Sequence, residues 1–263
     1  MIVKTTPELA ESFFEHLQIL KISDFEIFVE KHELIEIDTN IFFEVNITDN
    51  LLEGKILNLV DLYGQLVPGQ KSEIINPENF EKNEMVKKWN VMENFSIGFA
   101  DADLILRKHF GFGIGLHPST ILTLRALYEV LSENKNIEHI VDVGSGSGIL
   151  TLYAEKYSGD KIKNFTVFEI QEDAIHTMIE NFLVNNMDFQ NVHVNPELSQ
   201  LKNLNPETTL FVANMRPSEL KACENILNFG KIFIISGLMN DEENPVEMSG
   251  SKGMKFGEWR GEY

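Results

Sequence analysis

The chain has 263 residues, of which 43% are apolar, and its 22 basic and 41 acidic residues give a formal net charge of −19. This length allows one large domain or two smaller ones with a substantial core, and the absence of an apolar run of about 18 residues argues against a membrane span. The negative charge argues against tight direct binding of nucleic acid. It favours a basic protein or a cationic small molecule as partner, and the alternative is that the acidic surface only keeps the protein soluble.

The N-terminus and the cysteine content indicate a compartment. The segment MIVKTTPELAESFFEHL turns acidic early and has no cleavable apolar core, so we expect no signal peptide. Cys223 is the single cysteine, which excludes an internal disulfide and fits a reducing cytoplasm. Because the apolar residues around it have helical spacing, we expect this thiol to fill core rather than to act as a nucleophile.

Residues 1–95 predict a smaller α+β N-terminal region. In PELAESFFEHLQIL, apolar residues at helical spacing form one stripe: Leu9, Phe13, Leu17 and Leu20. The segments FEIFVE, ELIEID and IFFEVNI are short and rich in β-branched or aromatic residues, as strands are. NLLEGKILNLVDLYGQLV predicts a second amphipathic helix, and the polar segment 68–84, with its two prolines, predicts a loop or linker.

From about residue 96 strands alternate with helices. ADLILRKHF predicts a strand, and PSTILTLRALYEVLSE predicts a helix with Pro118 in its first turn and the hydroxyl of Ser119 or Thr120 as its cap. The next predicted elements are HIVDV, GILTLYAEKYS, NFTVFEI, EDAIHTMIENFLVNN, TLFVAN, PSELKACENIL and KIFIISGL, and MKFGEWRGEY predicts a last edge strand. This alternation indicates a doubly wound, mostly parallel α/β sheet over residues 96–263, with helices on both faces.

The segment VDVGSGSGIL places Gly144, Gly146 and Gly148 directly after a predicted buried strand. Glycine costs conformational entropy, so this density indicates unusual backbone angles or the close approach of another group. A dinucleotide fingerprint requires G-x-G-x-x-G, and neither Ile149 nor Thr151 supplies its last glycine. The turn suits a ligand without a pyrophosphate, such as S-adenosylmethionine, whose carboxylate can meet the amides at the helix start. A plain structural turn is the alternative.

Glu169 ends the next predicted strand, roughly 20 residues beyond the glycine turn, where an acid can accept hydrogen bonds from a ribose diol. The alternative is a solvated acid on an acidic surface. Together with the glycines, the position of Glu169 favours a nucleoside ligand at the carboxyl edge of the sheet.

Four segments, taken in chain order, resemble one family: FGFGIGLHPSTILTLRALYEVL, IVDVGSGSGIL, VFEIQEDAI and VANMRPSEL. The family is the bacterial methyltransferase, of Rossmann-like fold, that modifies a ribosomal protein at the stalk base of the large subunit. Most methyltransferases of this fold share the glycine turn, whereas the G-x-G-x-HP-[ST]-T segment, here Gly113 to Thr120, is far more specific. The resemblance covers roughly residues 98–240, with a further similarity in GEWRGEY.

The resemblance implies S-adenosylmethionine as cofactor and a set of contacts to it. Thr120 would hold the methionine end, Gly144 would lie against the cofactor backbone, and Glu169 would bind the ribose. Asn214 would lie beside the methyl group and the incoming amine, as both a cofactor contact and the catalytic residue. His117 would shape the loop that covers the cofactor. The other implied cofactor-binding residues surround the glycine turn: Asp142, Gly146 and Gly148.

The chemistry of amine methylation favours a neutral, dry acceptor site. The amide of Asn214 can orient an amine without stabilising its ammonium form, although a turn cap is the structural alternative. Deprotonating a lysine whose pKa is near 10.4 costs about 4.6 kcal/mol at pH 7, and an apolar pocket reduces this cost. Pro217 is predicted to begin the next helix, and Arg216 to be a solvated surface residue. Nearby apolar residues are candidates to line the pocket: Ile114, Leu116 and Met215.

The leading prediction is a cytoplasmic S-adenosylmethionine-dependent methyltransferase that N-methylates a protein, with residues 1–95 as a substrate-recognition region or cap. One alternative is a methyltransferase for a small-molecule acceptor. The other is a non-catalytic S-adenosylmethionine-binding protein whose N-terminal region is an interaction module. The histidines other than His117 lack metal-ligand spacing, so no metal is predicted at any of them: His16, His32, His109, His139, His176 and His193.

Overall fold

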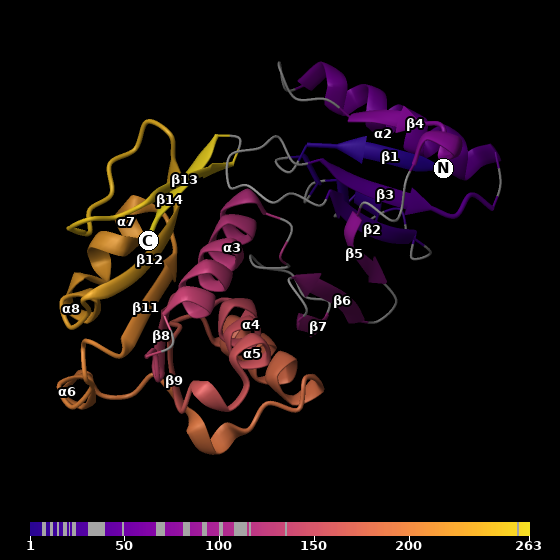
Figure 1. Cartoon of the computed structure of the whole chain (residues 1–263). Coiled ribbons are helices and arrows are strands. Elements are labelled where there is room, and N and C mark those ends of the chain that lie inside the picture. The colour runs from indigo at the N-terminus through magenta and orange to yellow at the C-terminus, as the bar shows by residue number, and fades with distance from the viewer. Residues whose placement is uncertain are drawn as a thin grey trace.

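The structure of the protein is a computed structural model (Figure 1). The residues that it describes are 1–6, 9–10, 13–14, 16–17, 20, 22, 25–30, 40–48, 50–66, 72–80, 85–90, 94–99, 102–107, 115, 117–134, 136–256 and 258–263. The predicted strand ELIEID and the predicted pocket residues Ile114 and Leu116 lie outside the described residues.

Residues 1–90 build an antiparallel sheet. Among the described residues it has five strands in the order β4-β1-β3-β2-β5. Their bounds are β1 (Ile2–Thr5), β2 (Phe25–Glu30), β3 (Ile41–Val45), β4 (Ser72–Ile75) and β5 (Met85–Asn90), and the helix α2 (Asn50–Leu66) lies between β3 and β4 in the chain. A hairpin of β6 (Asn94–Phe99) and β7 (Ala102–Arg107) follows.

Most of the predicted N-terminal elements are present. Most described residues of the first predicted helix are helical, and Leu9, Phe13 and Leu17 of its stripe are buried, whereas Leu20 lies in a turn and is partly buried. Strands β2 and β3 fall within FEIFVE and IFFEVNI, and α2 follows the second predicted helix. The spacing of apolar residues therefore located these elements correctly.

The predicted loop 68–84 is wrong in part, because it contains β4 and the short 3-10 helix Pro77–Asn79. Strand β4 pairs with β1 at the edge of the sheet. Phe80 packs on one sheet face, with its ring centroid 5.2 Å from those of Phe28 and Phe42. Strands β5 and β6 are further elements that the sequence pattern did not predict.

Residues 139–262 build a second sheet, whose order among the described residues is β10-β9-β8-β11-β12-β14-β13. The strands from β10 to β12 are parallel, and β14 and β13 are antiparallel. The bounds are β8 (His139–Val143), β9 (Asn164–Phe168), β10 (Val192–Val194), β11 (Thr209–Asn214), β12 (Ile232–Met239), β13 (Gly253–Phe256) and β14 (Trp259–Glu262). The strand order reverses between β8 and β11, and ligands bind at the carboxyl edge of such a switch point.

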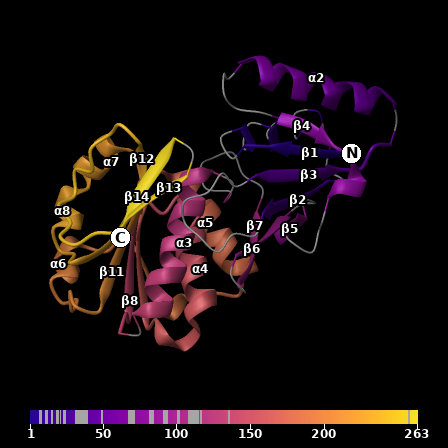
Figure 2. The same ribbon diagram turned by 45° about the horizontal axis from the view of Figure 1, so that its top comes forward.

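Helices cover both faces of this second sheet, as Figures 1 and 2 show. One face carries α3 (Pro118–Glu133), α4 (Ile149–Ser158) and α5 (Glu172–Val184), and the other carries α6 (Leu198–Leu201), α7 (Pro217–Ala222) and α8 (Glu224–Leu227). Residues of β8 alternate accordingly, because Ile140 joins the core under α3 to α5, and Val141 and Val143 join the core under α7 and α8. The predicted doubly wound, mostly parallel α/β sheet is confirmed.

Two predicted elements of this region differ in detail. The predicted helix PSELKACENIL is interrupted at Cys223, which ends α7 and precedes α8. The predicted last edge strand is a hairpin, in which β14 pairs with β12 and β13 lies outside it.

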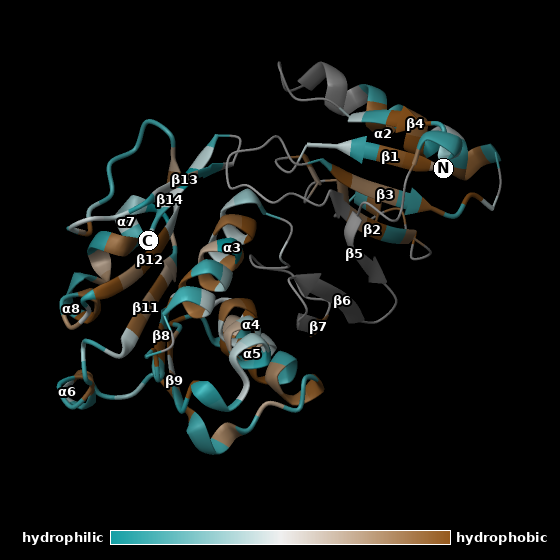
Figure 3. Cartoon of the chain, viewed as in Figure 1, coloured by the Kyte–Doolittle hydropathy of each residue, from teal (hydrophilic) through white to brown (hydrophobic). Residues whose placement is uncertain are grey.

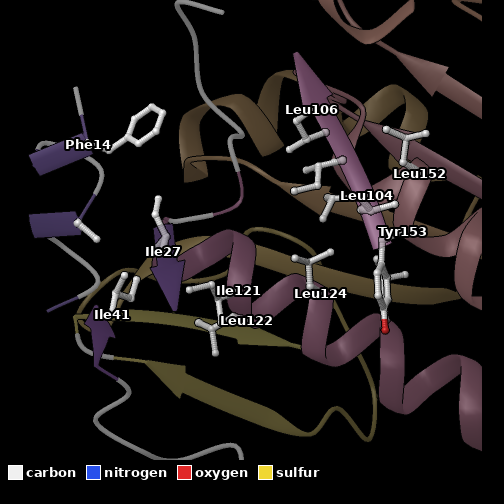
Figure 4. Packing of buried hydrophobic residues seen from close by; sticks show 14 of the residues in the cluster. Phe14, Ile27, Ile41, Leu104, Leu106, Ile121, Leu122, Leu124, Leu152 and Tyr153 are labelled. Atoms are coloured by element: carbon white, nitrogen blue, oxygen red, sulfur yellow. The ribbon is translucent and has the colours of Figure 1, made fainter. Parts of the chain in front are cut away.

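The β6–β7 hairpin is attached to the helices of the second sheet. Figure 4 shows Leu104 of β7 beside Tyr153 of α4 and Leu106 further along the same strand, and all three residues belong to one cluster of buried side chains. The Asn185 side chain, at the end of α5, adds hydrogen bonds to both backbone groups of Ile105, at 2.9 Å to its N–H and 2.6 Å to its C=O. The β6–β7 hairpin therefore packs against helices α4 and α5 of the second sheet.

The distribution of hydropathy follows this layering. In Figure 3 the strands β11 and β12 are mainly brown, and the segment that leads from β12 to β13 is mainly teal. Apolar residues are thus concentrated in the sheet that the helices cover. In the part of the chain that the structure describes, no helix combines the length and the hydropathy needed to cross a membrane.

Candidate functional site

The predicted site residues gather at the carboxyl edge of the parallel strands. Asp142 lies near the end of β8, Glu169 directly follows β9, and Asn214 ends β11. Thr120 comes from the first turn of α3, on the same edge. The fold therefore brings together residues from four segments that are distant in the sequence.

The glycine turn connects β8 to α4, and its three glycines all have positive φ. The angles are +73° at Gly144, +52° at Gly146 and +76° at Gly148, in a region that favours glycine. The turn is fastened to the end of β9, because the N–H groups of Gly144 and Ser145 donate to the Phe168 carbonyl at 2.8 and 3.1 Å. Backbone geometry therefore accounts for glycine at each of these positions.

Two of these glycines also lie against bulky side chains. A Cβ atom at Gly148 would approach Phe182 and Met178 to 2.6 and 2.7 Å, so this glycine permits α5 to pack closely on the turn. A Cβ atom at Gly144 would approach Met215 Sδ to 2.4 Å. The Met215 side chain therefore lies between the glycine turn and the end of β11.

Three backbone N–H groups hold the Glu169 carboxylate. Its Oε2 accepts from Gly146 at 2.9 Å, and its Oε1 accepts from Ile170 and Gln171 at 2.8 and 2.9 Å. A carboxylate has about four acceptor positions, so among the described residues one position on Oε2 is left for a further donor. Glu169 is 9% exposed, whereas Ile170 is 96% exposed. A hydrogen-bond acceptor and an apolar side chain thus occupy neighbouring positions.

Asn195, which was not among the predicted site residues, fixes the backbone of Glu169. Its Oδ1 accepts from Glu169 N at 2.9 Å, and its Nδ2 donates to Glu169 O at 2.7 Å. Asn195 itself has a positive φ of 45°. Its position just after β10, at the same edge as Glu169, was the signal that could have identified it.

Asp142 is a buried carboxyl group beneath the start of α4. It is 1% exposed, and its Oδ2 accepts from Thr151 Oγ1 at 2.7 Å. Its Oδ1 has no hydrogen-bond partner among the described residues. Burial raises the pKa of Asp142 to about 7, although the hydrogen bonds from Thr151 lower it and the charge of Glu169 raises it further. Asp142 therefore titrates near neutral pH beside the glycine turn.

We expect Asp142→Asn to stabilise the chain near pH 8 and to have little effect near pH 4. The folded-state pKa lies above the unfolded value, so the folded state favours the protonated form and loses stability as the pH rises from about 4 to about 7. Asparagine has no charge but still offers Thr151 a hydrogen-bond acceptor, so the variant does not lose stability as the pH rises. The difference in the free energy of unfolding near pH 8 is on the order of 2–4 kcal/mol. Urea unfolding at several pH values measures it, and a pH-independent difference would contradict the prediction.

The start of α3 is capped by His117. Its Nδ1 accepts from Ser119 N at 3.3 Å and lies 2.8 Å from Ser119 Oγ. The predicted capping by a hydroxyl of Ser119 or Thr120 is therefore wrong, whereas Pro118 begins the helix as predicted. Burial, and to a smaller extent the charge of Arg216, lower the pKa of His117 to about 4. The imidazole is thus neutral at pH 7 and can accept the capping hydrogen bond.

The Asn214 amide lies between the end of β11 and the first turn of α3. Its Nδ2 donates to Thr120 Oγ1 at 3.2 Å. Its Oδ1 is buried and has no hydrogen-bond partner among the described residues. Because a buried acceptor without a donor costs free energy, this oxygen is suited to a donor that a ligand supplies.

Arg216 was predicted to be a solvated surface residue, and its side chain is 40% exposed, but it also has specific partners. Its Nη2 forms an ion pair with Glu242, and its Cζ lies 5.3 Å from the centroid of the Trp259 ring. The Trp259 ring in turn meets the His117 ring, with centroids 4.5 Å apart. Pro217 begins α7, as predicted. The partners of Arg216 are distant in the sequence, so no local sequence pattern predicted them.

A comparison with protein families matches residues 77–260 to the family described as ribosomal protein L11 methyltransferase (PrmA). The chain belongs to this family. Membership in this family confirms two predictions, namely that the chain is a methyltransferase and that its cofactor is S-adenosylmethionine. The match begins ahead of residues 98–240, on which the resemblance in the sequence was based.

Two relatives illustrate how far the L11 methyltransferase family match extends. The ribosomal protein L11 methyltransferase of Aquifex aeolicus is 26% identical over 233 residues, which are 86% of this chain and 88% of the relative. That of Shouchella clausii is 30% identical over 178 residues, which are 64% of this chain and 51% of the relative. The chain thus spans most of the first relative's length and about half of the second's.

A comparison with solved structures finds chains whose fold is partly similar to this one. The SAM-dependent methyltransferase from Agrobacterium tumefaciens has a TM-score of 0.41 at 11% identity, over 58% of this chain and 55% of its own. TYW2 of M. jannaschii, in complex with AdoMet, has a TM-score of 0.42 at 15% identity, over 65% of this chain and 84% of its own.

Other polar features of this methyltransferase lie away from the site. A cavity of about 240 Å³, lined by His139 and His193 among others, lies at the amino ends of β8 and β9, opposite the glycine turn. Cys223 packs partly buried against the core under α7 and α8, and burial raises the pKa of its thiol. Among the described residues no three His, Cys, Asp or Glu side chains are grouped to hold a metal.

Proposed function

We propose that the chain transfers methyl groups from S-adenosylmethionine to an amine of a protein, and that this protein is ribosomal protein L11. The names of its relatives support the substrate, and the net charge of −19 supports a basic partner. The observation that carries the proposal is the buried Oδ1 of Asn214, an acceptor that has no donor among the described residues.

Residues of the carboxyl edge fit both ends of the cofactor. Glu169 Oε2 can accept one further hydrogen bond, as a ribose hydroxyl would donate, and exposed Ile170 offers apolar surface to a purine. Buried Asp142 Oδ1 can accept from the ammonium of the methionine end, and Thr120 lines the same side. The turn that would receive the methionine carboxylate at the start of α4 consists of three glycines: Gly144, Gly146 and Gly148.

Asn214 would orient the acceptor. S-adenosylmethionine, when bound, supplies a methyl group on a sulfonium, which is already a good leaving group. The chain's main task is therefore placement, which is worth up to roughly 7–11 kcal/mol. With Nδ2 of Asn214 tethered to Thr120, its Oδ1 can accept an N–H of the amine and hold the nitrogen lone pair in one direction. The neutral amide does this without the stabilisation of ammonium that a carboxylate would add.

We further propose a division of labour along the chain. Residues 1–95 would act as a substrate-recognition region or cap, and residues 96–263 would form the cofactor-binding domain. Two observations support this division: residues 1–90 form a sheet of their own, and the family match excludes most of them. The Met215 side chain, next to Asn214, would contribute apolar surface to the acceptor side.

Purified components test this proposal. We expect labelled S-adenosylmethionine to transfer its methyl group to purified ribosomal protein L11, and calorimetry to detect binding of both S-adenosylmethionine and S-adenosylhomocysteine. Glu169→Ala should weaken cofactor binding at least about tenfold, since it removes the acceptor that also holds the glycine turn. Glu172→Ala, at an exposed acid in the first turn of α5, is the matched control and should bind normally.

Three outcomes would contradict parts of the proposal. Label found only in the metabolite fraction of a whole-cell extract would replace the protein substrate by a small molecule. Tight cofactor binding without transfer to any fraction would favour a non-catalytic binding protein. Equal cofactor affinity in the Glu169→Ala and Glu172→Ala proteins would remove Glu169 from the site.

A further inference from the structure

Next to Asn214 lies a group of side chains that the proposed cofactor contacts do not use. We call it the Trp259 cluster, and it consists of His117, Arg216, Glu242 and Trp259. The His117 ring meets the Trp259 ring edge-on, with centroids 4.5 Å apart, and Arg216 Cζ lies over that ring at 5.3 Å from its centroid. A guanidinium within about 6 Å of an aromatic centroid makes a favourable cation–π contact.

The Trp259 cluster and Asn214 share two structural elements. Arg216 follows β11 two positions after Asn214, directly before α7. His117 caps α3, whose Thr120 accepts from the Asn214 amide. Figure 1 shows α7, the start of α3 and the β13–β14 hairpin at the same end of the sheet. Arg216 and Asn214, whose Oδ1 has no donor among the described residues, therefore lie at the same end of the second sheet.

Three contacts fix the Arg216 guanidinium. Besides lying over Trp259, it pairs through Nη2 with Glu242 and donates from Nη1 to the Gly237 carbonyl at 3.4 Å. Glu242 is fixed in turn, because its other carboxylate oxygen accepts from Met239 N at 2.8 Å. The Arg216 side chain is 40% exposed, and these three contacts give its positive charge a set position.

We propose that Arg216 is a positioning residue for the acceptor, whose fixed positive charge, tethered by Glu242, disfavours a protonated amine at Asn214 and so admits the neutral, nucleophilic form. This inference rests on the proposed amine methylation. A nearby cation lowers the pKa of an amine, because repulsion between like charges destabilises only the ammonium form. The proton that the ammonium loses goes to solvent water before the nitrogen attacks.

Among the described residues, three other charged groups surround the Trp259 cluster, and Arg216 is the charge that acts on the His117 ring. Glu219 faces Arg216 from α7, where its carboxylate accepts from the Arg216 backbone N–H at 2.9 Å. Arg260 faces Glu242 from β14 and donates from Nε to its backbone carbonyl at 3.1 Å, and its own charge is paired with Glu262 at 2.5 Å. His117 adds no charge at pH 7, since burial and the charge of Arg216 lower its pKa to about 4.

Two variants separate an effect of charge from a loss of packing, with purified ribosomal protein L11 as the acceptor. Arg216→Met keeps an apolar chain on Trp259 and removes the charge. The apparent pKa of the acceptor in the pH profile of kcat/KM should then rise by about one unit, which lowers the rate at pH 7 about tenfold. Glu242→Gln frees the charge of Arg216, so the same pKa should fall. If Arg216 and Glu242 only stabilised the structure, both variants would lose activity, and the apparent pKa of the acceptor would not shift in opposite directions.

NMR titration of His117 provides a readout that does not depend on activity. Arg216→Met should raise the pKa of His117 from about 4 toward its ordinary value, whereas Glu242→Gln should not raise it. Lys231→Met is the matched control: it removes an exposed positive charge that pairs with Glu207 at 2.6 Å, at the other end of β12. It should leave both the pH profile and the His117 titration unchanged.

The possible results distinguish this inference from the function on which it rests. Coincident pH profiles for the wild type and Arg216→Met would overturn the inference and leave the methyltransferase function intact. An unchanged His117 titration in Arg216→Met would overturn it too, because the charge would then not reach the site. If the wild type transfers no methyl group to L11 at any pH, the proposed function itself is refuted.

Discussion

Gly237→Ala is expected to lower the free energy of unfolding by about 3 kcal/mol. Gly237 has a φ of +87°, and a Cβ atom there would approach the Met215 backbone O and N to 2.5 and 2.7 Å. Positive φ costs a non-glycine residue roughly 1–2 kcal/mol, and overpacking of a core costs roughly 1–3 kcal/mol. Relief by movement is difficult, because the atoms in contact are backbone at the end of a central strand. Since Met215 adjoins Asn214, we expect methyl transfer to fall as well.

Two exposed glycines that follow β12 separate the cost of a positive φ from the cost of overpacking. Gly250 has a φ of +74° and open space around its Cα, whereas Gly253 has open space and no positive φ. We expect Gly250→Ala to cost about 1 kcal/mol and Gly253→Ala to stay within roughly 0.5 kcal/mol of the wild type. Urea unfolding of the three variants gives the comparison. If Gly237→Ala proves as stable as Gly253→Ala, the close approach of β11 and β12 at this point is incorrect.

Local sequence patterns predicted the elements of the second sheet well. The helix at 118–133 and the strand at 139–143 have the predicted bounds, because apolar periodicity and a buried β-branched run are properties of neighbouring residues. The glycine turn was located for the same reason, since positive φ at Gly144 is a demand of the local backbone. The cofactor and the family followed from motifs of this local kind.

Features that depend on distant partners could not be predicted in this way. Strand β4 was assigned to a loop, because its pairing with β1 joins residues as far apart as Thr5 and Ser72, whose hydroxyls lie 2.8 Å apart. The ion pair and ring contact of Arg216 were not predicted, because its partners Glu242 and Trp259 come from later segments. The contact of Thr120 with Asn214 likewise depends on α3 crossing the sheet, although the roles of both residues remain predictions.

Asn214→Ala is expected to lower kcat for methyl transfer to ribosomal protein L11 about 100-fold while cofactor affinity changes less than about threefold. Alanine removes the Oδ1 that we assign to the acceptor N–H, and a loss of orientation alone can cost about this factor. The substitution also removes the hydrogen bond from the Asn214 amide to Thr120 Oγ1 at 3.2 Å. Thr120→Val removes the same hydrogen bond but keeps Asn214, so it measures how much of the loss in kcat comes from the orientation of the amide. Single-turnover rates and calorimetry on each variant provide the two measurements.

Asn214→Asp gives the sharper result, because it keeps the shape and changes only the charge. A carboxylate there would stabilise the ammonium form of the acceptor, so we expect the apparent pKa in the rate profile to rise and activity to recover partly at high pH. Asn225→Ala, at an exposed residue of α8, should behave as the wild type. If Asn214→Ala turns over at the rate of Asn225→Ala, then Asn214 only caps the end of β11, and its buried oxygen has no part in the chemistry.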